Sequence, residues 1–482
     1  MRCPPVSLFV PSKVVLRYRP SVAASRAIYV TQGRGFMLEL TGGKISCCDG
    51  LPRRDFLRAG FLGLGGLSLS QVLQHRAEAA AAKKSVRKTS VLYIEMAGGP
   101  SQHDTYDPKP LSPVEYRGLY GSVPTTLPGV RFCDRFPHQA SVMDKLAVIR
   151  SMHHDSGSHT TSSHLTQTGY YLRNRLNRDN EMPCTGSITS RLRGPNKAGV
   201  PPFVSISRAM RYGRAAYLGQ GYNPFPTGGD PNKKNFSVEN LSLVRGLSSD
   251  RLENRQALLK SFDEQRRILD TEGVAGSIDD FTAQAFEIVT GARAREAFDI
   301  QQETDKTRDR YGRSTLGQSF LLARRLIEAG VTFVTIRVGS WDHHWDLEAR
   351  MARMAPGFDL GLATLVTELH ERALDQDVLV VGMGEFGRSP RMNDGRKRGT
   401  PGRDHWGNLM SVLLAGGGLQ VGQVIGASDA NGERPIASPY RPEDVLAMMY
   451  RHLDIDVQQT FPDHSGRPRY ILESGDMIPE LI

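Results

Sequence analysis

Histidine and aspartate side chains gather in four short segments of this chain of 482 residues. Residues 101–107, 153–164, 341–346 and 403–407 together contain eight of the 13 histidines. Imidazole nitrogen and carboxylate oxygen are the ligands that zinc takes in proteins, and carboxylates also bind manganese, magnesium or calcium. The four segments therefore predict a shared site for a divalent metal, zinc in the first place, with the three harder ions as alternatives.

Five side chains are the candidates for holding this metal. Asp342 and His344 are two positions apart in the chain, so that both can face a single ion, and His405 and Asp104 are predicted to complete the set. For Asp104 a turn or a helix cap is the competing explanation, because an aspartate after a strand often has that role. Glu385 follows an apolar run and is predicted to be a further ligand or a catalytic base.

Short apolar runs alternate with long amphipathic stretches from residue 88 onward, which predicts an α/β fold with a mostly parallel central sheet covered by helices. The expected strands are 90–96, 146–150, 203–207, 332–338, 377–382 and 411–415, and the expected helices are 314–329, 357–374 and 441–453. A helical insertion is expected at about 250–310. Several polar segments directly follow predicted strands, and the carboxyl ends of parallel strands share one edge, so we expect them to converge.

The N-terminal part resembles an export signal. Arg53 and Arg54 precede Phe56-Leu57 and an apolar stretch that is too short and too rich in glycine to span a bilayer well. This pattern predicts a twin-arginine signal region at 37–82, read by the twin-arginine export machinery, and a periplasmic or otherwise extracytoplasmic location. The alternative is an uncleaved anchoring helix. Met37 is the expected start of translation, which makes residues 1–36 an extension wrongly assigned to the protein.

The excess of positive charge lies mostly ahead of the predicted cleavage region. The chain carries 61 basic and 51 acidic residues, a net charge of +10, and residues 1–79 account for +7 of it. Since the remainder shows no basic stripe with interleaved aromatic residues, nucleic acid is not an expected partner. Cys133 and Cys184 remain in the predicted mature chain, where export would permit them to pair.

Four motifs together resemble a known protein family: Gly-Gly-Pro-Ser-Gln-His-Asp-Thr-Tyr-Asp-Pro-Lys-Pro at 98–110, Ala-Arg-Arg-Leu-Ile-Glu-Ala-Gly-Val at 323–331, Gly-Glu-Phe-Gly-Arg-Ser-Pro at 384–390 and Gly-Arg-Asp-His-Trp-Gly at 402–407. The set is similar to the domain of unknown function numbered 1501, within the alkaline-phosphatase and sulfatase-like superfamily. The resemblance implies an alkaline-phosphatase-like domain over 88–482, with a central sheet, two metal sites and a serine, threonine or modified cysteine nucleophile.

The resemblance also implies roles for single residues. Asp104 is similar to the first-strand aspartate of the superfamily, Asp342 with His344 to the ligand pair of one metal site, and His405 to the late histidine. Glu385 is at the place of the superfamily's Asp-His dipeptide, and Phe386 stands where that dipeptide has histidine. The chain therefore departs from the superfamily's pattern at the second metal site. At the nucleophile position the chain has His159, flanked by Ser158 and Thr160, so the nucleophile is assigned to either hydroxyl.

The function expected from these observations is an exported, metal-dependent hydrolase of phosphate or sulfate esters. Its substrate would be a small-molecule or polysaccharide ester. The sulfatase signature Cys-x-Pro-x-Arg is absent, since Thr-Gly-Ser-Ile follows Cys184, which disfavours a formylglycine-type sulfatase. The alternative function is a catalytically reduced protein of the same fold that binds a metal or an anionic glycan without turnover.

Overall fold

The computed structural model describes residues 87–238 and 291–482, positions 241, 285, 287 and 288, and three short strands near the N-terminus. The chain divides into two units, Met1–Val86 and Arg87–Ile482. In the first unit, β1 (Lys13–Arg17), β2 (Ala27–Gly33) and β3 (Gly35–Glu39) form an antiparallel sheet. The predicted twin-arginine motif and cleavage region lie outside the described residues. No described helix has both the length and the apolar character needed to cross a membrane.

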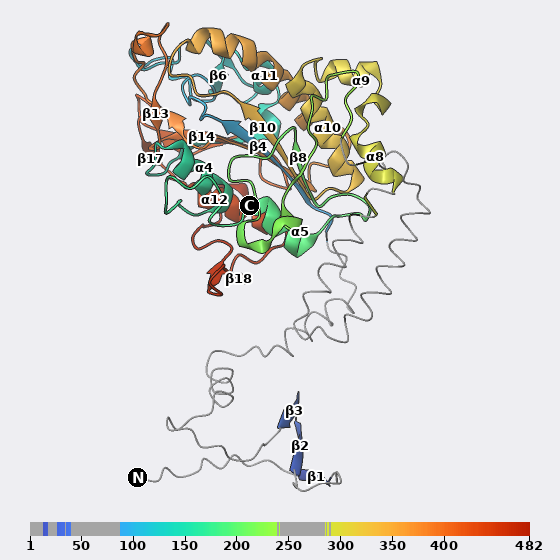
Figure 1. Ribbon diagram of the computed structural model, residues 1–482. Coiled ribbons are helices and arrows are strands. Elements are labelled where there is room, and N and C mark those ends of the chain that lie inside the picture. Colours follow the sequence, from blue (N-terminus) through green and yellow to red (C-terminus); the bar gives the residue numbers. More distant parts are fainter. Residues whose placement is uncertain are drawn as a thin grey trace, which may run out of the picture. The chain divides into compact units, whose positions relative to one another are not determined.

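The second unit is built on an eight-stranded sheet (Figure 1). In spatial order its strands are β15 (Gln423–Ile425), β7 (Leu146–Met152), β14 (Met410–Gly416), β11 (Val378–Met383), β4 (Ser90–Ala97), β10 (Phe333–Gly339), β8 (Phe203–Ile206) and β9 (Phe225–Pro226). Every neighbouring pair is parallel except the two pairs that include β14, which is therefore the one reversed strand of this sheet. The predicted mostly parallel α/β sheet is confirmed, and the six predicted strands agree with the structure to within two residues at each end.

Helices cover both faces of the sheet. They are α3 (Pro137–Ala140), α4 (His159–Thr168), α5 (Thr185–Arg193), α8 (Ala292–Phe298), α9 (Asp305–Arg310), α10 (Thr315–Ala329), α11 (Leu347–Glu371) and α12 (Pro442–His452). Most of the predicted insertion at 250–310 lies outside the described residues, and its described end contains α8 and α9. Four two-stranded ladders complete the unit: β5 (Ser122–Pro124) with β6 (Arg131–Cys133), β12 (Gly387–Arg388) with β13 (His405–Trp406), β16 (Ala427–Ser428) with β17 (Pro435–Ala437), and β18 (Thr460–Pro462) with β19 (Pro468–Tyr470).

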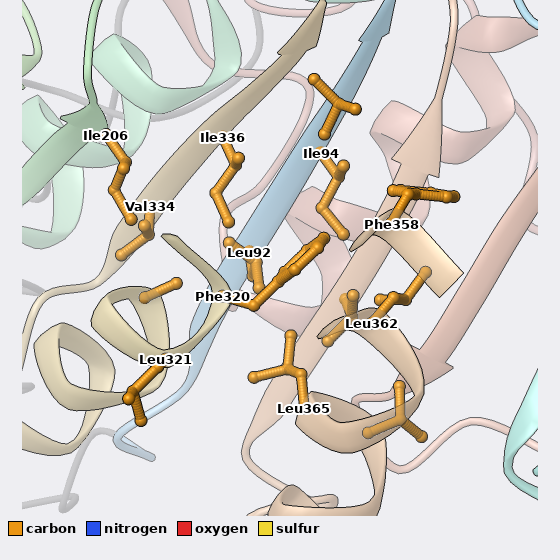
Figure 2. Close-up of a cluster of buried hydrophobic side chains, with 14 of the residues drawn as sticks. Leu92, Ile94, Ile206, Phe320, Leu321, Val334, Ile336, Phe358, Leu362 and Leu365 are labelled. Atoms are coloured by element: carbon orange, nitrogen blue, oxygen red, sulfur yellow. The ribbon is translucent and has the colours of Figure 1, made fainter. Parts of the chain in front are cut away.

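The central strand β4 is buried along its whole length because helices pack against both of its faces. Leu92 and Ile94 belong to the hydrophobic cluster formed with α10 and α11, where Phe320 packs (Figure 2). Val91 and Tyr93 point the other way, into the cluster formed with α5 and α12. This alternation follows from the two-residue period of a strand and explains why the apolar run of β4 is continuous.

Helix α11 differs from the prediction at its start. It begins at Leu347 rather than at residue 357 and contains Pro356 in its interior. Proline removes a backbone donor and usually ends a helix, so the sequence pattern placed the boundary just after it. Cys133 and Cys184 are both buried and free, so the structure does not pair them.

The direction of β14 determines what collects at one edge of the sheet. The amino end of β14 pairs with the carboxyl end of β7, with Met410 opposite Met152, and Leu413 lies opposite Gly382 near the carboxyl end of β11. The segment that precedes β14 therefore reaches the same edge as the segments that follow β4, β7, β10 and β11.

Candidate metal centre

All four predicted histidine-bearing segments reach this edge, and three of them contribute side chains to one cluster. His159 lies at the first position of α4, after β7; Asp342 and His344 lie in the loop after β10; and His405 lies in β13, just before β14. We call His159, Asp342, His344 and His405 the histidine–aspartate cluster. The two-residue ladder of β12 and β13 places His405 directly opposite Arg388, so backbone pairing fixes where this imidazole enters the cluster.

The carboxylate of Asp342 is the centre of the cluster. Its Oδ1 atom lies 3.0 Å from Nε2 of His405 and 3.1 Å from Nε2 of His344. Its Oδ2 atom lies 3.4 Å from Nε2 of His159. Three imidazole rings thus present the same nitrogen, Nε2, to a single carboxylate.

The other nitrogen of each ring faces an oxygen atom that can only accept a hydrogen bond from it. Nδ1 of His405 lies 2.9 Å from the carbonyl oxygen of Gly157, and Nδ1 of His344 lies 2.5 Å from Oδ1 of Asp404. Nδ1 of His159 lies 2.7 Å from Oε1 of Glu385. Such partners hold the proton on Nδ1 and leave the Nε2 lone pair free in the neutral ring.

This arrangement of tautomers favours a cation between the rings. Nε2 of His344 and Nε2 of His405 are 2.9 Å apart, and in neutral rings both atoms would carry lone pairs that face each other and the carboxylate of Asp342. Either protons or a metal ion must lie between them. A tetrahedral zinc ion with bonds of about 2.0–2.1 Å places its ligand atoms about 3.3 Å apart. Nε2 of His405 lies 3.0 Å from Oδ1 of Asp342, and Nε2 of His159 lies 3.4 Å from Oδ2, which are comparable separations. Ligand atoms of His159, Asp342 and His405 all lie within 4.8 Å of one another.

Glu385 supports the cluster from the side of β11. Its two carboxylate oxygens accept hydrogen bonds from the backbone N–H of Gly98, both at 2.9 Å, and Oε1 also holds His159. Glu385 is 5% exposed, and within the described residues its carboxylate is nearest to Nδ1 of His159 rather than to the ring nitrogens that converge on Asp342. Its contacts suit the orientation of a metal-binding histidine.

Arg388 supplies the permanent positive charge of the site. Its Nη2 atom lies 2.5 Å from Oδ1 of Asp342, and its remaining donors bind the carbonyl oxygens of Gly98, Gly99 and Arg403. The guanidinium is 1% exposed, so its place is fixed by these contacts. The sequence alone is equally compatible with an ion pair and with a ligand contact for Arg388, and the structure shows the ion pair.

Charge and burial set the protonation of the cluster. Burial raises the pKa of Asp342, but hydrogen bonds from His159, His405 and Arg388 outweigh it and hold the pKa far below its usual value. Burial lowers the pKa of His159, but the hydrogen bonds to Asp342 and Glu385 and their negative charges raise it to about 9. Burial lowers the pKa of His344 despite its hydrogen bond to Asp404. Without a metal, a proton on His159 therefore supplies part of the required positive charge.

Asp104 is not among the residues that the structure brings together here. Its carboxylate accepts hydrogen bonds from Nε of Arg403 at 2.9 Å, from the hydroxyl of Ser101 at 2.5 Å and from the backbone of Leu119 at 2.7 Å. None of its contacts in the described part of the chain is with the cluster. Burial opposes ionisation, but the charge of Arg403 and these hydrogen bonds lower the pKa of Asp104.

The two predicted nucleophiles lie beside the cluster without joining it. The hydroxyls of Ser158 and Thr160 lie 3.0 Å from each other. In the described structure neither hydroxyl contacts a carboxylate or an imidazole. Phe386, the residue that replaces the expected histidine, is fully buried and packs its ring against His159 and His405, with ring centroids 5.0 Å and 4.5 Å away.

A cavity of about 350 Å³ opens next to the cluster. Its lining includes His159, Asp342 and Glu385 together with Glu95, Arg211 and Arg337. Ser163 is the hydroxyl-bearing residue that α4 contributes to this lining. The cavity is of the size expected for a small ligand.

Sequence reasoning missed Asp404. Its Oδ1 atom binds Nδ1 of His344 and also the guanidinium of Arg396. The signal was present, because Asp404 directly precedes His405 in a segment already selected for its histidine. Adjacent residues of an extended segment point to opposite sides, so these two side chains were not expected to act on one cluster.

Comparison with known proteins identifies a family over the second unit. Residues 88–482 match the family described as "Protein of unknown function (DUF1501)". No curated protein sequence matches the chain. Among solved structures, the PsFucS1 sulfatase from Pseudoalteromonas sp. is 12% identical, with 81% of this chain and 72% of that chain covered and a TM-score of 0.36.

Two further structures have comparable similarity. The alkaline phosphatase from the Antarctic bacterium TAB5 is 10% identical, with 77% of this chain and 99% of that chain covered and a TM-score of 0.35. The lipoteichoic acid synthase LtaP from Listeria monocytogenes is 8% identical, with 77% and 73% covered and a TM-score of 0.35.

Proposed function

The chain belongs to the DUF1501 family of proteins of unknown function, and on this premise we propose that it is a metal-dependent hydrolase of phosphate or sulfate esters. The observation that carries the proposal is the convergence of three Nε2 atoms on the carboxylate of Asp342, with every Nδ1 atom held by an oxygen. A divalent metal bound there would polarise an ester oxygen and make water nucleophilic near neutral pH.

The chain's own residues would divide the remaining tasks. His159, Asp342 and His405 would hold the ion, and Nε2 of His344, which faces the same carboxylate, would be a further ligand. Glu385 would fix the ring of His159 through Nδ1. Water is the proposed nucleophile, since Ser158 and Thr160 bind each other and not a base. The cavity next to Asp342 would receive the ester.

A second function is supported by the contacts of Ser158 and Thr160, whose hydroxyls bind each other and not a base in the described structure. The protein would then bind a metal or an anionic glycan without turnover. Metal content and turnover separate the two functions, because the hydrolase requires both a bound ion and turnover, whereas the binding protein shows no turnover.

The test is metal analysis of the full chain purified without chelators, followed by assay with 4-nitrophenyl phosphate and 4-nitrophenyl sulfate. The hydrolase predicts bound divalent metal and turnover, both lost in Asp342→Ala. Asp179→Ala is the matched control, because Asp179 is exposed and lies outside the cluster. Metal without turnover on any ester would support the binding protein, and folded protein that retains no divalent metal would refute the hydrolase and the metal-binding form of the second function.

We also propose that the protein is exported through the twin-arginine machinery. The support is the sequence around Arg53 and Arg54 alone. Replacement of both arginines by lysine keeps the charge and should leave the protein in the cytoplasm, as measured by cell fractionation. Export that is unchanged in this variant would contradict the proposal.

A further inference from the structure

The cavity beside the histidine–aspartate cluster has a second polar wall. Asp342, His159 and Glu385 line the cavity, and so do Glu95, Arg211 and Arg337, which we call the second polar wall. Glu95 and Arg337 lie on neighbouring strands, β4 and β10, whose register sets them directly opposite each other. Arg211 comes from the irregular segment after β8. The second wall is therefore partly built into the sheet.

Glu95 holds the guanidinium of Arg337 at Nε and leaves its terminal nitrogens available to a ligand. Its Nε atom lies 3.1 Å from Oε2 of Glu95, whose side chain is 5% exposed, whereas the side chain of Arg337 is 38% exposed. Its two terminal nitrogens make no hydrogen bond to the described part of the chain. A guanidinium fixed on one side by a buried carboxylate and open on the other offers paired donors for an anion.

Arg211 adds a second guanidinium to the same wall. It is exposed, and it contacts the ring of the adjacent Tyr212, 5.6 Å from the ring centroid. Within the described residues it forms no ion pair. Burial and the negative charge of Glu385 raise the pKa of Glu95 to about 8, against the opposing effect of Arg337. The raised pKa favours the protonated form of Glu95, so it neutralises less of the charge of the two arginines than an ordinary carboxylate would.

We propose that Arg337 and Arg211 bind a second anionic group of the substrate, beside the ester held at the histidine–aspartate cluster. The preferred substrate class is then an ester of a molecule that carries a further carboxylate, sulfate or phosphate, and esters without such a group would be hydrolysed more slowly. That this anion is part of a substrate rests on the proposed hydrolase function. The anion site itself rests on the cavity wall and exists without the metal.

Titration of the metal-free full chain with sodium sulfate tests the anion site directly. The chelator-treated protein is studied by isothermal titration calorimetry, with sodium chloride keeping the ionic strength constant. We expect saturable binding of sulfate, weakened at least about tenfold in Arg211→Gln because a charge-assisted contact is lost. The same loss is expected in the double variant Glu95→Gln/Arg337→Gln, which avoids leaving a buried carboxylate without its partner.

Arg434→Gln is the matched control, because it removes the same charge from a side chain that is 76% exposed outside this cavity. It should bind sulfate as the unchanged protein does. Circular dichroism confirms that each variant is folded. Sulfate affinity that is the same in Arg211→Gln, in the double variant and in the unchanged protein would overturn the proposal, as would the lack of saturable binding to the unchanged protein.

The outcome is independent of the ester assay. Sulfate binding that depends on the arginines, in a protein with no turnover, would support the anion site and contradict the hydrolase function. Turnover in a protein whose metal-free form binds no sulfate would support the hydrolase function and contradict the anion site.

Discussion

Replacement of Asp104 by asparagine separates a structural carboxylate from a metal ligand. Asp104 and Arg403 are both fully buried, and the two side chains meet at 2.9 Å. The other donors of Arg403 bind the backbone carbonyl oxygens of Ser389, Pro390, Tyr116 and Arg117. An asparagine in place of Asp104 would leave the charge of Arg403 buried among neutral groups.

The expected cost follows from this burial. Removal of one partner from a buried ion pair costs about 3–5 kcal/mol. At about 2 °C per kcal/mol, the lower slope for large domains, the melting temperature should fall by about 6–10 °C. Because Asp104 contacts no member of the histidine–aspartate cluster, the folded variant should retain the metal content of the unchanged protein.

Differential scanning calorimetry measures the melting temperature, and elemental analysis of the folded variant at low temperature measures the metal. The double variant Asp104→Asn/Arg403→Gln should lose less stability than the sum of the two single variants, because the unpaired charge is gone. A variant of Asp104 that melts normally but has lost its metal would refute this reasoning and make Asp104 a ligand.

Three other changes test separate parts of the structure. Gly98→Ala should lower the melting temperature, because Gly98 has φ +108° and an added Cβ would lie 2.5 Å from the backbone nitrogen of Asp342; Gly129→Ala, at φ +79° with open space around it, is the control and should cost less. His159→Gln should weaken metal binding at least tenfold in a competition titration at pH 8, and unchanged affinity would exclude His159 as a ligand. Glu95→Gln should reduce the fall of melting temperature between pH 5 and pH 8. Burial raises the pKa of Glu95 to about 8, so the folded state keeps a proton that the unfolded chain releases. The stability that Glu95 contributes therefore declines as the pH rises through this range, and the variant lacks this decline. Parallel profiles for the two proteins would contradict this assignment.

Much of the fold was readable because its central strands are buried on both faces. The apolar runs in β4 (91–94) and β11 (378–381) are continuous, and continuous apolar runs between turn signals are typical of parallel strands under two layers of helices. The start of α11 was missed because tertiary packing tolerates Pro356 inside the helix, where local rules place an end.

The site was predictable at the level of segments but not of contacts. Asp342, His344 and His405 were selected by residue type and by their position near strand ends, and they do meet. Whether a carboxylate pairs with a positively charged side chain or binds a metal ion depends on which group lies beside it in the folded chain. Asp104 meets Arg403, which is 299 residues away in the chain, and no spacing in the sequence encodes that pair.

The direction of β14 also determines which connections of this protein tolerate a change of length. Residues 407–409 join β13 to β14, and a deletion within them would shift His405 against the carboxylate it faces. The connection at 372–377, between α11 and β11, lies at the opposite edge, about 20 Å away along a strand of six residues. Affinity tags, labelling sites and grafted loops belong at that far edge, where a change of length leaves the metal-binding side chains in place.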